Sequence, residues 1–368
     1  MTQPWTTLPA MTAALDELVS CESPSSDAVA TKACGEVFAE LALARLDARP
    51  ERIELGGRTH LRYTWGTPRV LVLGHLDTVW PNGTLARWPF SVDGDVATGP
   101  GVFDMKAGVV QALWALSSLP SLDGVSLLLT VDEELGSPSS AGLVVDSARG
   151  CVATLVCEPS ADGALKVARK GIAMYELVVT GRAAHAGLEP EKGVNAALAM
   201  AHLVVAAAAL SAPEVGTTVT PTLLSAGSTS NTVPASGRVA IDVRAALPEE
   251  LPRVEAALQQ AISVAERTVP GVRVQLLGGV NRPPLDRASS QELFGRAGRL
   301  ARARNLPTLA GVAVGGGSDG NFTARAGIPT LDGLGAVGGG AHAEGEHVRL
   351  SAMPPRAQLL ADLLGELL

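Results

Sequence analysis

Several side chains that could bind a metal or move a proton follow directly after apolar segments of this chain. These residues are His75-Leu-Asp77 after the apolar segment 69–74, Asp132-Glu133-Glu134 after the segment 125–131, and Glu158 after the segment 154–157. Continuous apolar runs of this length are typical of strands buried on both faces of a largely parallel sheet. Ligand and catalytic groups in such sheets gather at the carboxyl ends of the strands. Because so many carboxylates in one crevice repel each other unless cations neutralise them, the sequence predicts a metal site. The glycine-containing segment 99–108 adds Asp104 to it.

Size and composition favour a globular enzyme. The chain has 368 residues, enough for one large or two modest domains at roughly 100–200 residues each. No apolar stretch reaches the roughly 18 residues of a membrane span, so we expect no membrane partner. The N-terminus lacks the basic and apolar segments of a secretory signal, and we expect a cytoplasmic protein. A net charge of −8 without a basic stripe argues against a nucleic-acid partner. The four cysteines show no CxxC spacing and are expected to stay reduced.

The order of the predicted elements indicates an α/β domain interrupted by a smaller one. The middle of the chain has predicted strands at 172–181, 219–227, 237–245 and 272–277, and predicted helices at 191–210 and 248–269. This β-α-β-β-α-β order is the split βαβ, ferredoxin-like motif. We therefore predict a catalytic domain formed by residues 1–170 and 281–368. It would be a mixed, mostly parallel sheet with helices on both faces, and residues 171–280 would be a complete, smaller α+β domain inserted into it.

The motifs along the chain resemble those of a known enzyme family. They are His75-Leu-Asp77, Gly99-Pro-Gly-Val-Phe-Asp104-Met-Lys-Ala-Gly108, Asp132-Glu-Glu134, Cys157-Glu158-Pro159, Gly181-Arg-Ala-Ala-His185-Ala-Gly, Asn231-Thr-Val-Pro-Ala, Asp242-Val-Arg244, Gly315-Gly-Gly-Ser-Asp319 and Gly340-Ala-His342. In this order they resemble the dinuclear zinc exopeptidases and N-deacylases. That family includes the glutamate carboxypeptidases (carboxypeptidase G), acetylornithine deacetylase and succinyl-diaminopimelate desuccinylase. The segment from Trp80 to Phe90, followed by Gly-Pro-Gly, is most similar to the glutamate carboxypeptidase branch.

The resemblance implies a site for two Zn²⁺ ions per subunit, with Co²⁺ or Mn²⁺ as alternatives. Asp104 would bridge both ions, His75 and Glu158 would complete one, and Glu134 and His342 the other. Histidine nitrogen and carboxylate oxygen are donors that zinc accepts, and catalytic zinc sites keep a position open for water. His347 competes with His342, which we favour because it follows the glycine loop as the family pattern requires.

The same resemblance assigns catalytic roles to two further carboxylates. Asp77 would orient the imidazole of His75. Glu133 would be the general base. It would take a proton from the water that bridges the two ions and pass that proton to the leaving nitrogen. Neighbouring side chains diverge, so Glu133 can face the water while Glu134 faces the metal.

The resemblance implies that residues 171–280 are a lid and dimerisation domain, and specificity is expected to come from this domain. A guanidinium suits a carboxylate, so Arg244 is a natural anchor for a substrate's free α-carboxylate, and a structural ion pair is the alternative. Asn231 could hold the same carboxylate or the scissile carbonyl. The histidine matching His185 reaches, in this family, into the active site of the neighbouring subunit of a homodimer. Gly317 would let backbone amides approach a substrate carboxylate, and a nucleotide site is disfavoured because no βαβ unit surrounds it. The role of Lys170 stays open.

The interpretation we favour is a metal-dependent exopeptidase that releases a C-terminal amino acid, with glutamate as the candidate, from N-acyl amino acids or short peptides. One alternative is a deacylase of the acetylornithine or succinyl-diaminopimelate kind, and another is a dipeptidase. An aminopeptidase would need a site for a free α-amine, and the sequence shows none. A non-catalytic binding protein is a remote alternative, since it would be expected to have lost some of the metal ligands or the base.

Overall fold

The computed structural model describes residues 8–368, which form two compact units. Unit 1 combines the described residues up to Ala168 with Leu285–Val314 and Ser318–Leu368. Unit 2 consists of Arg169–Pro284 together with Gly315–Gly317. The chain therefore leaves one unit, builds the other, and returns.

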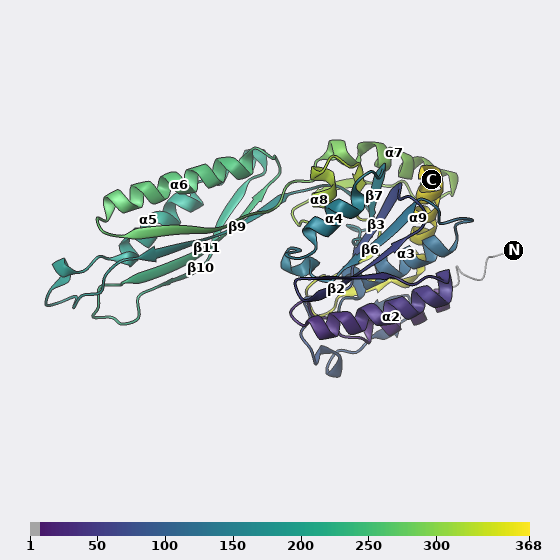
Figure 1. Cartoon of the computed structure of the whole chain (residues 1–368), viewed down its shortest axis with the longest axis horizontal. Coiled ribbons are helices and arrows are strands. Elements are labelled where there is room, and N and C mark those ends of the chain that lie inside the picture. The colour runs from purple at the N-terminus through teal and green to yellow at the C-terminus, as the bar shows by residue number, and fades with distance from the viewer. Residues whose placement is uncertain (1–7) are drawn as a thin grey trace. The chain divides into compact units, whose positions relative to one another are not determined.

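Unit 1 is built on a six-stranded mixed sheet (Figure 1). The strands follow the order β1 (Glu51–Leu55), β2 (Arg58–Thr64), β6 (Val125–Thr130), β3 (Val70–His75), β7 (Ala153–Val156) and β14 (Thr330–Leu331). The β6–β3, β3–β7 and β7–β14 pairs are parallel, whereas β1–β2 and β2–β6 are antiparallel. The central strands β6, β3 and β7 are buried along their whole length. Such strands carry apolar side chains on both faces, as the sequence predicts.

Helices cover both faces of this sheet, and strand alternation decides which side chains meet which helices. Val70 and Val72 belong to the core cluster that includes α1 (Leu8–Val19), α2 (Ala28–Leu46), α3 (Ala107–Ser117), α7 (Arg287–Ala303) and α9 (Met353–Leu367). Leu71 and Leu73 point the other way, into the cluster with α4 (Ala141–Ala148) and α8 (Gly320–Arg325). Figure 1 shows α4 and α8 on one side of β3 and β6, and α3 and α9 on the other.

Two small sheets complete unit 1 and its border. One is antiparallel, in the order β15 (Gly338–Gly339), β16 (His347–Arg349), β5 (Val96–Thr98) and β4 (Ser91–Asp93). The other pairs β13 (Gly311–Val314) with β8 (Leu165–Arg169). Strands of two or three residues have no periodicity that a sequence pattern could reveal.

Unit 2 is a four-stranded antiparallel sheet with two helices. Its elements are β9 (Gly171–Thr180), α5 (Ala196–Ala208), β10 (Thr218–Ala226), β11 (Ser236–Ala245), α6 (Glu250–Thr268) and β12 (Arg273–Arg282), and the sheet order is β10-β11-β9-β12. The side chains of α5 and α6 share one apolar core with the sheet. Helix α5 begins later than predicted because Asn195 is its N-cap, accepting a hydrogen bond from the amide of Leu198.

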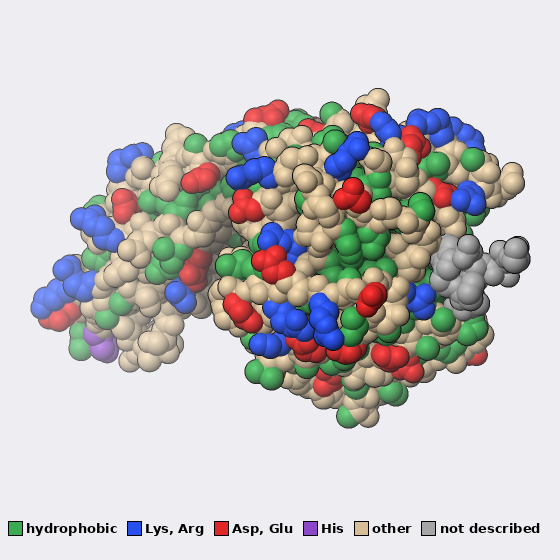
Figure 2. Space-filling model, turned by 45° about the vertical axis from the view of Figure 1, so that its right-hand side comes forward, with side chains coloured by type: hydrophobic (Ala, Val, Ile, Leu, Met, Phe, Trp, Pro, Cys, Tyr) green, Lys and Arg blue, Asp and Glu red, His purple; other side chains and the backbone are tan. Residues whose placement is uncertain are grey.

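The predicted fold class is confirmed: a mixed, mostly parallel sheet flanked by helices, with an inserted ferredoxin-like unit. Within residues 8–368, no helix is both long and apolar enough to span a membrane. Figure 2 shows acidic and basic side chains interspersed, rather than separated by sign, on the face that it displays.

Candidate metal centre

Three neighbouring strands of unit 1 deliver the candidate ligands to one edge of the sheet. His75 is the last residue of β3, the Glu133-Glu134 pair follows β6, and Glu158 follows β7. Since β6, β3 and β7 lie side by side and are parallel, their carboxyl ends coincide. Asp104 arrives from the irregular segment Val102–Lys106 that precedes α3.

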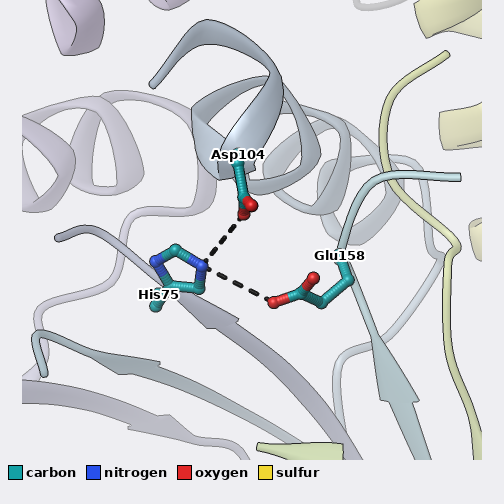
Figure 3. A group of neighbouring side chains, drawn as sticks. All are labelled: His75, Asp104 and Glu158. Atoms are coloured by element: carbon teal, nitrogen blue, oxygen red, sulfur yellow. Dashed lines mark ion pairs between the residues drawn. The ribbon is translucent and has the colours of Figure 1, made fainter. Parts of the chain in front are cut away.

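The first group of side chains consists of His75, Asp104 and Glu158 (Figure 3). Nε2 of His75 lies 3.3 Å from Oδ1 of Asp104 and 3.5 Å from Oε1 of Glu158. The His75 side chain is 2% exposed, so this group is almost closed to solvent. The two carboxylates approach the same imidazole nitrogen from different elements, as the dashed lines of Figure 3 show.

The second group consists of Asp104, Glu134 and His342, so Asp104 belongs to both. Nε2 of His342 lies 3.0 Å from Oε2 of Glu134 and 3.5 Å from Oδ2 of Asp104. Asp104 thus faces one histidine with each of its carboxylate oxygens. The competing His347 is not in either group, and its Nδ1 lies 2.9 Å from the carbonyl of Gly345.

The residues present fit metal ions. Within each group, one donor atom per residue lies within 4.8 Å of the others. Among the residues that the structure describes, Nε2 of His75 and Oδ1 of Asp104 are buried without a hydrogen-bond partner. Buried polar atoms are rarely left in this state, and a cation between them would satisfy both. Imidazole nitrogen and carboxylate oxygen form a donor set typical of catalytic zinc.

The electrostatics of these side chains reflect the crowding of carboxylates around the two histidines. Burial opposes charge on His75, but the carboxylates of Asp104, Asp77 and Glu158 outweigh it and raise the pKa of His75 well above its usual range. Hydrogen bonds with Asp104 and Glu134 raise the pKa of His342 to about 10. Burial raises the pKa of Glu134. Without metal, protons on the two imidazoles therefore provide the positive charge that the carboxylates require.

Asp77 holds together the histidine and the glutamate pair, a connection that the sequence did not reveal. Its backbone carbonyl lies 3.0 Å from Nδ1 of His75, which leaves Nε2 directed at the other carboxylates. Its carboxylate oxygens accept hydrogen bonds from the backbone amides of Glu133 and Glu134, at 3.3 and 3.2 Å. The fully buried Asp77 therefore orients one candidate ligand and fixes the loop that carries the other two acids.

Two further residues support this centre, and sequence reasoning did not find them. The buried hydroxyl of Ser25 donates a 2.7 Å hydrogen bond to Oδ2 of Asp77. Nζ of Lys166 lies 3.8 Å from Oε2 of Glu158. Ser25 is 52 residues from its partner and has no motif around it, so no local signal could have identified it. Lys166 lies in β8, and nothing in the surrounding sequence apart from the short strand itself marks this lysine as a partner of Glu158.

In unit 2, the structure brings His185 and Asn231 together. His185 forms a bridge with Thr232, and the amide of Ala186 donates to the carbonyl of Asn231 at 2.9 Å. Nδ1 of His185 accepts hydrogen bonds from the amides of Gly187 and Leu188, both at 3.2 Å. An imidazole that accepts at Nδ1 carries its proton on Nε2, so the exposed ring of His185 presents an N–H donor outward.

Arg244 lies near the end of β11 and is paired within its own strand. Its Nε and Nη2 donate to the carboxylate of Asp242, at 2.9 and 2.8 Å. The pair is partly exposed, with 32% of the Arg244 side chain and 28% of the Asp242 side chain accessible. The guanidinium is therefore held in place but can still be reached by a ligand.

The remaining two predicted positions, Gly317 and Lys170, both belong to unit 2. Gly317 packs against Ile172, since a Cβ at position 317 would lie 2.8 Å from its Cδ1. The carbonyls of Gly316 and Gly317 accept hydrogen bonds from Arg169. Lys170 is the single residue between β8 and β9. For Gly317, close packing against Ile172 is thus a structural reason for glycine that does not involve a substrate.

Comparison with known proteins gives a consistent result. The model of peptidase family M20/M25/M40 matches residues 71–366. Carboxypeptidase G2 from Pseudomonas sp. (strain RS-16) is 31% identical over 379 residues, covering 98% of this chain and 89% of that protein. A succinyl-diaminopimelate desuccinylase from Anaplasma marginale (strain Florida) is 35% identical over 133 residues, which cover 33% of this chain and 35% of that protein.

Solved structures share the fold. A tripeptidase from Staphylococcus aureus superposes with a TM-score of 0.83 at 19% identity, covering 98% of each chain. An M20 family metallo-carboxypeptidase from Sulfolobus solfataricus gives a TM-score of 0.75 at 16% identity, covering 96% of this chain and 98% of that one. The chain therefore belongs to peptidase family M20/M25/M40, whose members depend on metal ions, typically zinc, and it is a hydrolase of the metallocarboxypeptidase and amidohydrolase kind.

Proposed function

We propose that this enzyme releases a C-terminal amino acid, with glutamate as the leading candidate, from N-acyl amino acids or short peptides. The observation that carries the proposal is the pair of side-chain groups that share Asp104. Two adjacent sets of nitrogen and oxygen donors joined by one carboxylate suit two cations held close together. The similarity to carboxypeptidase G2 along nearly the whole chain supports the carboxypeptidase reaction over the alternatives.

In this proposal the centre holds two Zn²⁺ ions, which Co²⁺ or Mn²⁺ could replace. His75, Asp104 and Glu158 would hold one ion, and Asp104, Glu134 and His342 the other. Bound zinc lowers the pKa of a coordinated water and polarises the scissile carbonyl.

Glu133 then acts as the general base. It is 7% exposed and directly precedes Glu134, so it is a buried carboxylate next to a candidate ligand. Its carboxylate takes the proton of the attacking water and delivers it to the leaving nitrogen as the C–N bond breaks. The hydrogen bonds from the amides of Glu133 and Glu134 to Asp77 keep this base at a constant distance from the ligands.

Unit 2 supplies substrate recognition. Asp242 accepts hydrogen bonds from Nε and Nη2 of Arg244. The remaining N–H donors of the guanidinium bind the free carboxylate of the substrate. His185 directs its Nε2–H at the oxygen that gains negative charge in the transition state. Asn231, which is adjacent to His185, holds the scissile carbonyl, and the amides around Gly317 are a weaker candidate for the same carboxylate that Arg244 binds.

These roles require two chains, because Arg244 and His185 lie toward opposite ends of one sheet. Arg244 pairs with Ile172 where the chain enters unit 2, whereas Ser236 pairs with Thr180 at the end that leads to His185. The eight residue-to-residue steps from Ser236 to Arg244 span about 26 Å at roughly 3.3 Å each. A dipeptide extends only about 7 Å, so it cannot contact both residues of one chain. We therefore propose a homodimer in which His185 and Asn231 serve the partner's centre.

The edge strand β10 is the proposed dimer contact. It lies at one edge of the sheet, next to β11, and two apolar side chains on it, Leu223 and Leu224, are 74% and 61% exposed. An edge with exposed apolar side chains is an uncovered pairing surface, and a two-fold pairing of equal edges would cover it. Sedimentation analysis of Leu224→Lys should show monomers where the parent chain shows dimers, and a dimeric variant would move the contact elsewhere.

The decisive experiment for the function is a substrate panel. The zinc-loaded protein is assayed with N-acyl amino acids and dipeptides, each as the free acid and as the methyl ester or amide of its C-terminus. The proposal expects hydrolysis of the free acids, with N-acyl glutamates among the best, and at least tenfold lower kcat/KM for the blocked forms. Equal rates on free and blocked substrates would contradict a carboxypeptidase that anchors a carboxylate.

A deacylase of the succinyl-diaminopimelate type is the second candidate. The local similarity to a desuccinylase supports it, although that similarity covers only a third of this chain. The same panel separates the two functions. A deacylase would select the acyl group, such as succinyl or acetyl, and tolerate different amino acids, whereas the proposed carboxypeptidase selects the amino acid that leaves.

A further inference from the structure

Glu346 is a buried carboxylate that none of the proposed roles uses. The residue has no solvent exposure, although it lies in the otherwise exposed loop between His342 and β16. The partners that the structure gives it, among residues 8–368, are neutral hydrogen-bond donors. Burial raises the pKa of Glu346, and the hydrogen bonds that it accepts oppose this rise. A carboxylate buried at such a cost needs donors that compensate for the lost water.

The donors come from the segment that carries Asp104. Oε1 of Glu346 accepts from the backbone amides of Phe103 and Asp104, at 2.8 and 2.9 Å. Oε2 accepts from the amide of Gly101 at 3.1 Å and from the indole of Trp80 at 2.8 Å. Each oxygen therefore accepts two hydrogen bonds, and three of the four come from the backbone beside a single candidate ligand.

We infer that Glu346 is a positioning residue that sets the geometry of both metal sites by fixing the backbone of Asp104; this inference rests on the proposed two-metal function. Asp104 must present one oxygen to each ion, so a rotation of its backbone disturbs both ions together. The segment Val102–Lys106 is not a regular helix, since Asp104 and Met105 have non-helical dihedral angles. The amides of Val102 and Lys106 donate to the nearby carbonyls of Gly99 and Gly101, whereas those of Phe103 and Asp104 donate to Glu346, which lies more than 240 residues away along the chain.

Glu346 also couples the shared ligand to the second histidine. It follows His342 by four residues in the same loop. His342 has a positive φ of 62°, a conformation that costs energy for a residue with a side chain and that the surrounding loop must maintain. A single carboxylate thus connects the segment that carries Asp104 with the loop that presents His342. Groups that orient metal ligands in this way commonly change metal affinity 10- to 100-fold when they are removed.

The test compares Glu346→Gln with Glu344→Gln. Glu344 lies in the same loop, is exposed, and forms an ion pair with Arg87 at 3.2 Å, so it is a matched control for the loss of one charge. Dissociation constants for zinc are measured by chelator competition on the full chain. We expect Glu346→Gln to weaken zinc binding about 10- to 100-fold and to alter the visible absorption spectrum of the cobalt-loaded protein. Glu344→Gln should change neither by more than about twofold.

The amide of glutamine has only one oxygen, so its NH₂ group must face two of the four donors in either orientation. Trp80→Phe removes one donor from the pair at Oε2. Alone, it should weaken zinc binding severalfold. The double variant with Glu346→Gln should lose much less zinc affinity than the sum of the two single losses. The reason is that the NH₂ group of the glutamine can then take the place of Oε2 without facing the indole N–H of Trp80.

Asp104→Asn separates failure of this inference from failure of the proposed function. If Asp104→Asn retained full zinc affinity, the proposed metal centre itself would be wrong. If Asp104→Asn lost zinc while Glu346→Gln kept the parent affinity and cobalt spectrum, the positioning role of Glu346 would be overturned and the metal centre would stand. If Glu346→Gln failed to fold, Trp80→Phe would decide: weaker binding supports the role, and unchanged binding overturns it.

Discussion

The two units of this chain hold their candidate functional residues in opposite ways. In unit 1, His75, Asp77 and Glu158 are almost fully buried, and several elements of the sheet fix them. In unit 2, His185 and Asn231 are exposed and lie in loops, bonded mainly to nearby backbone. The comparison indicates that unit 1 fixes its candidate metal ligands by burial, whereas His185 and Asn231 are left accessible to a substrate or to a second chain.

The contrast has an energetic basis. Ligands for metal ions must be held to a fraction of an ångström, and buried hydrogen bonds provide that rigidity. Residues that bind a substrate must admit it and release it, so exposure is necessary for them. Substitutions in unit 1 should therefore affect metal content or the chemical step, and substitutions in unit 2 should affect binding or depend on the partner chain.

The largest effect is expected within the glutamate pair of unit 1. Glu133→Gln should retain its metal while kcat falls roughly 10²- to 10⁴-fold, because the change removes a proton acceptor but no ligand. Glu134→Gln should instead lower the metal content. Elemental analysis beside steady-state kinetics gives both quantities. If Glu133→Gln were the metal-depleted variant, the roles of the two residues would be exchanged.

His185→Ala tests whether unit 2 acts across a dimer. Alone, this variant should bind metal normally and lose roughly 10²- to 10³-fold in kcat, as expected when one donor to the developing oxyanion is removed. Mixed with Glu133→Gln under subunit exchange, it should regain activity, since each heterodimer can form one site with both wild-type residues. Heterodimers that mass spectrometry detects but that remain inactive would show that His185 does not act in trans.

Arg244→Ala should act mainly on substrate binding. Losing a charge-assisted contact costs about 1.5–3 kcal/mol, so KM for free acids should rise about 10- to 100-fold, with little change for their methyl esters. Asp242→Asn is the informative control because it releases the guanidinium from its partner. If Arg244 were only a structural partner of Asp242, both variants would lower thermal stability alike and leave the preference for free acids unchanged.

The most gradual effect concerns protons at the metal centre. The pKa of His342 is raised to about 10 and that of His75 is also raised, so both imidazoles are protonated at neutral pH without metal. A metal ion binds the neutral form and must displace these protons. Displacing the proton of His342 should therefore make zinc affinity fall about tenfold per pH unit as pH decreases below 10, and a proton displaced from His75 would make the fall steeper. Zinc added to the metal-free protein in weak buffer should acidify the solution; an unchanged pH would contradict this charge distribution.

The sequence predicted much of this centre because its residues follow buried strands. The apolar runs before His75, Glu133 and Glu158 became the adjacent strands β3, β6 and β7, whose register brings the following residues together. Alternation between apolar and polar positions likewise predicted the order of elements in unit 2. Patterns of this kind depend only on neighbouring residues, so they can be read from one sequence.

Other features depend on contacts that no local pattern encodes. Ser25 meets Asp77, and Glu346 meets the amides beside Asp104, across 52 and more than 240 residues of chain. The sequence left two roles for Arg244, a substrate anchor or a structural ion pair. The structure shows that Arg244 forms a bidentate pair with Asp242. Strands such as β15 are too short to show a period.

The unequal exposure of the two histidines implies that the two proposed metal positions would exchange their ions at different rates. The side chain of His75 is 2% exposed, whereas that of His342 is 50% exposed. A chelator in solution reaches the outer position first, while the ion beside His75 leaves only when the surrounding core opens. Brief dialysis against a chelator followed by cobalt should therefore yield a mixed-metal enzyme, with zinc retained in the inner position and cobalt in the outer one.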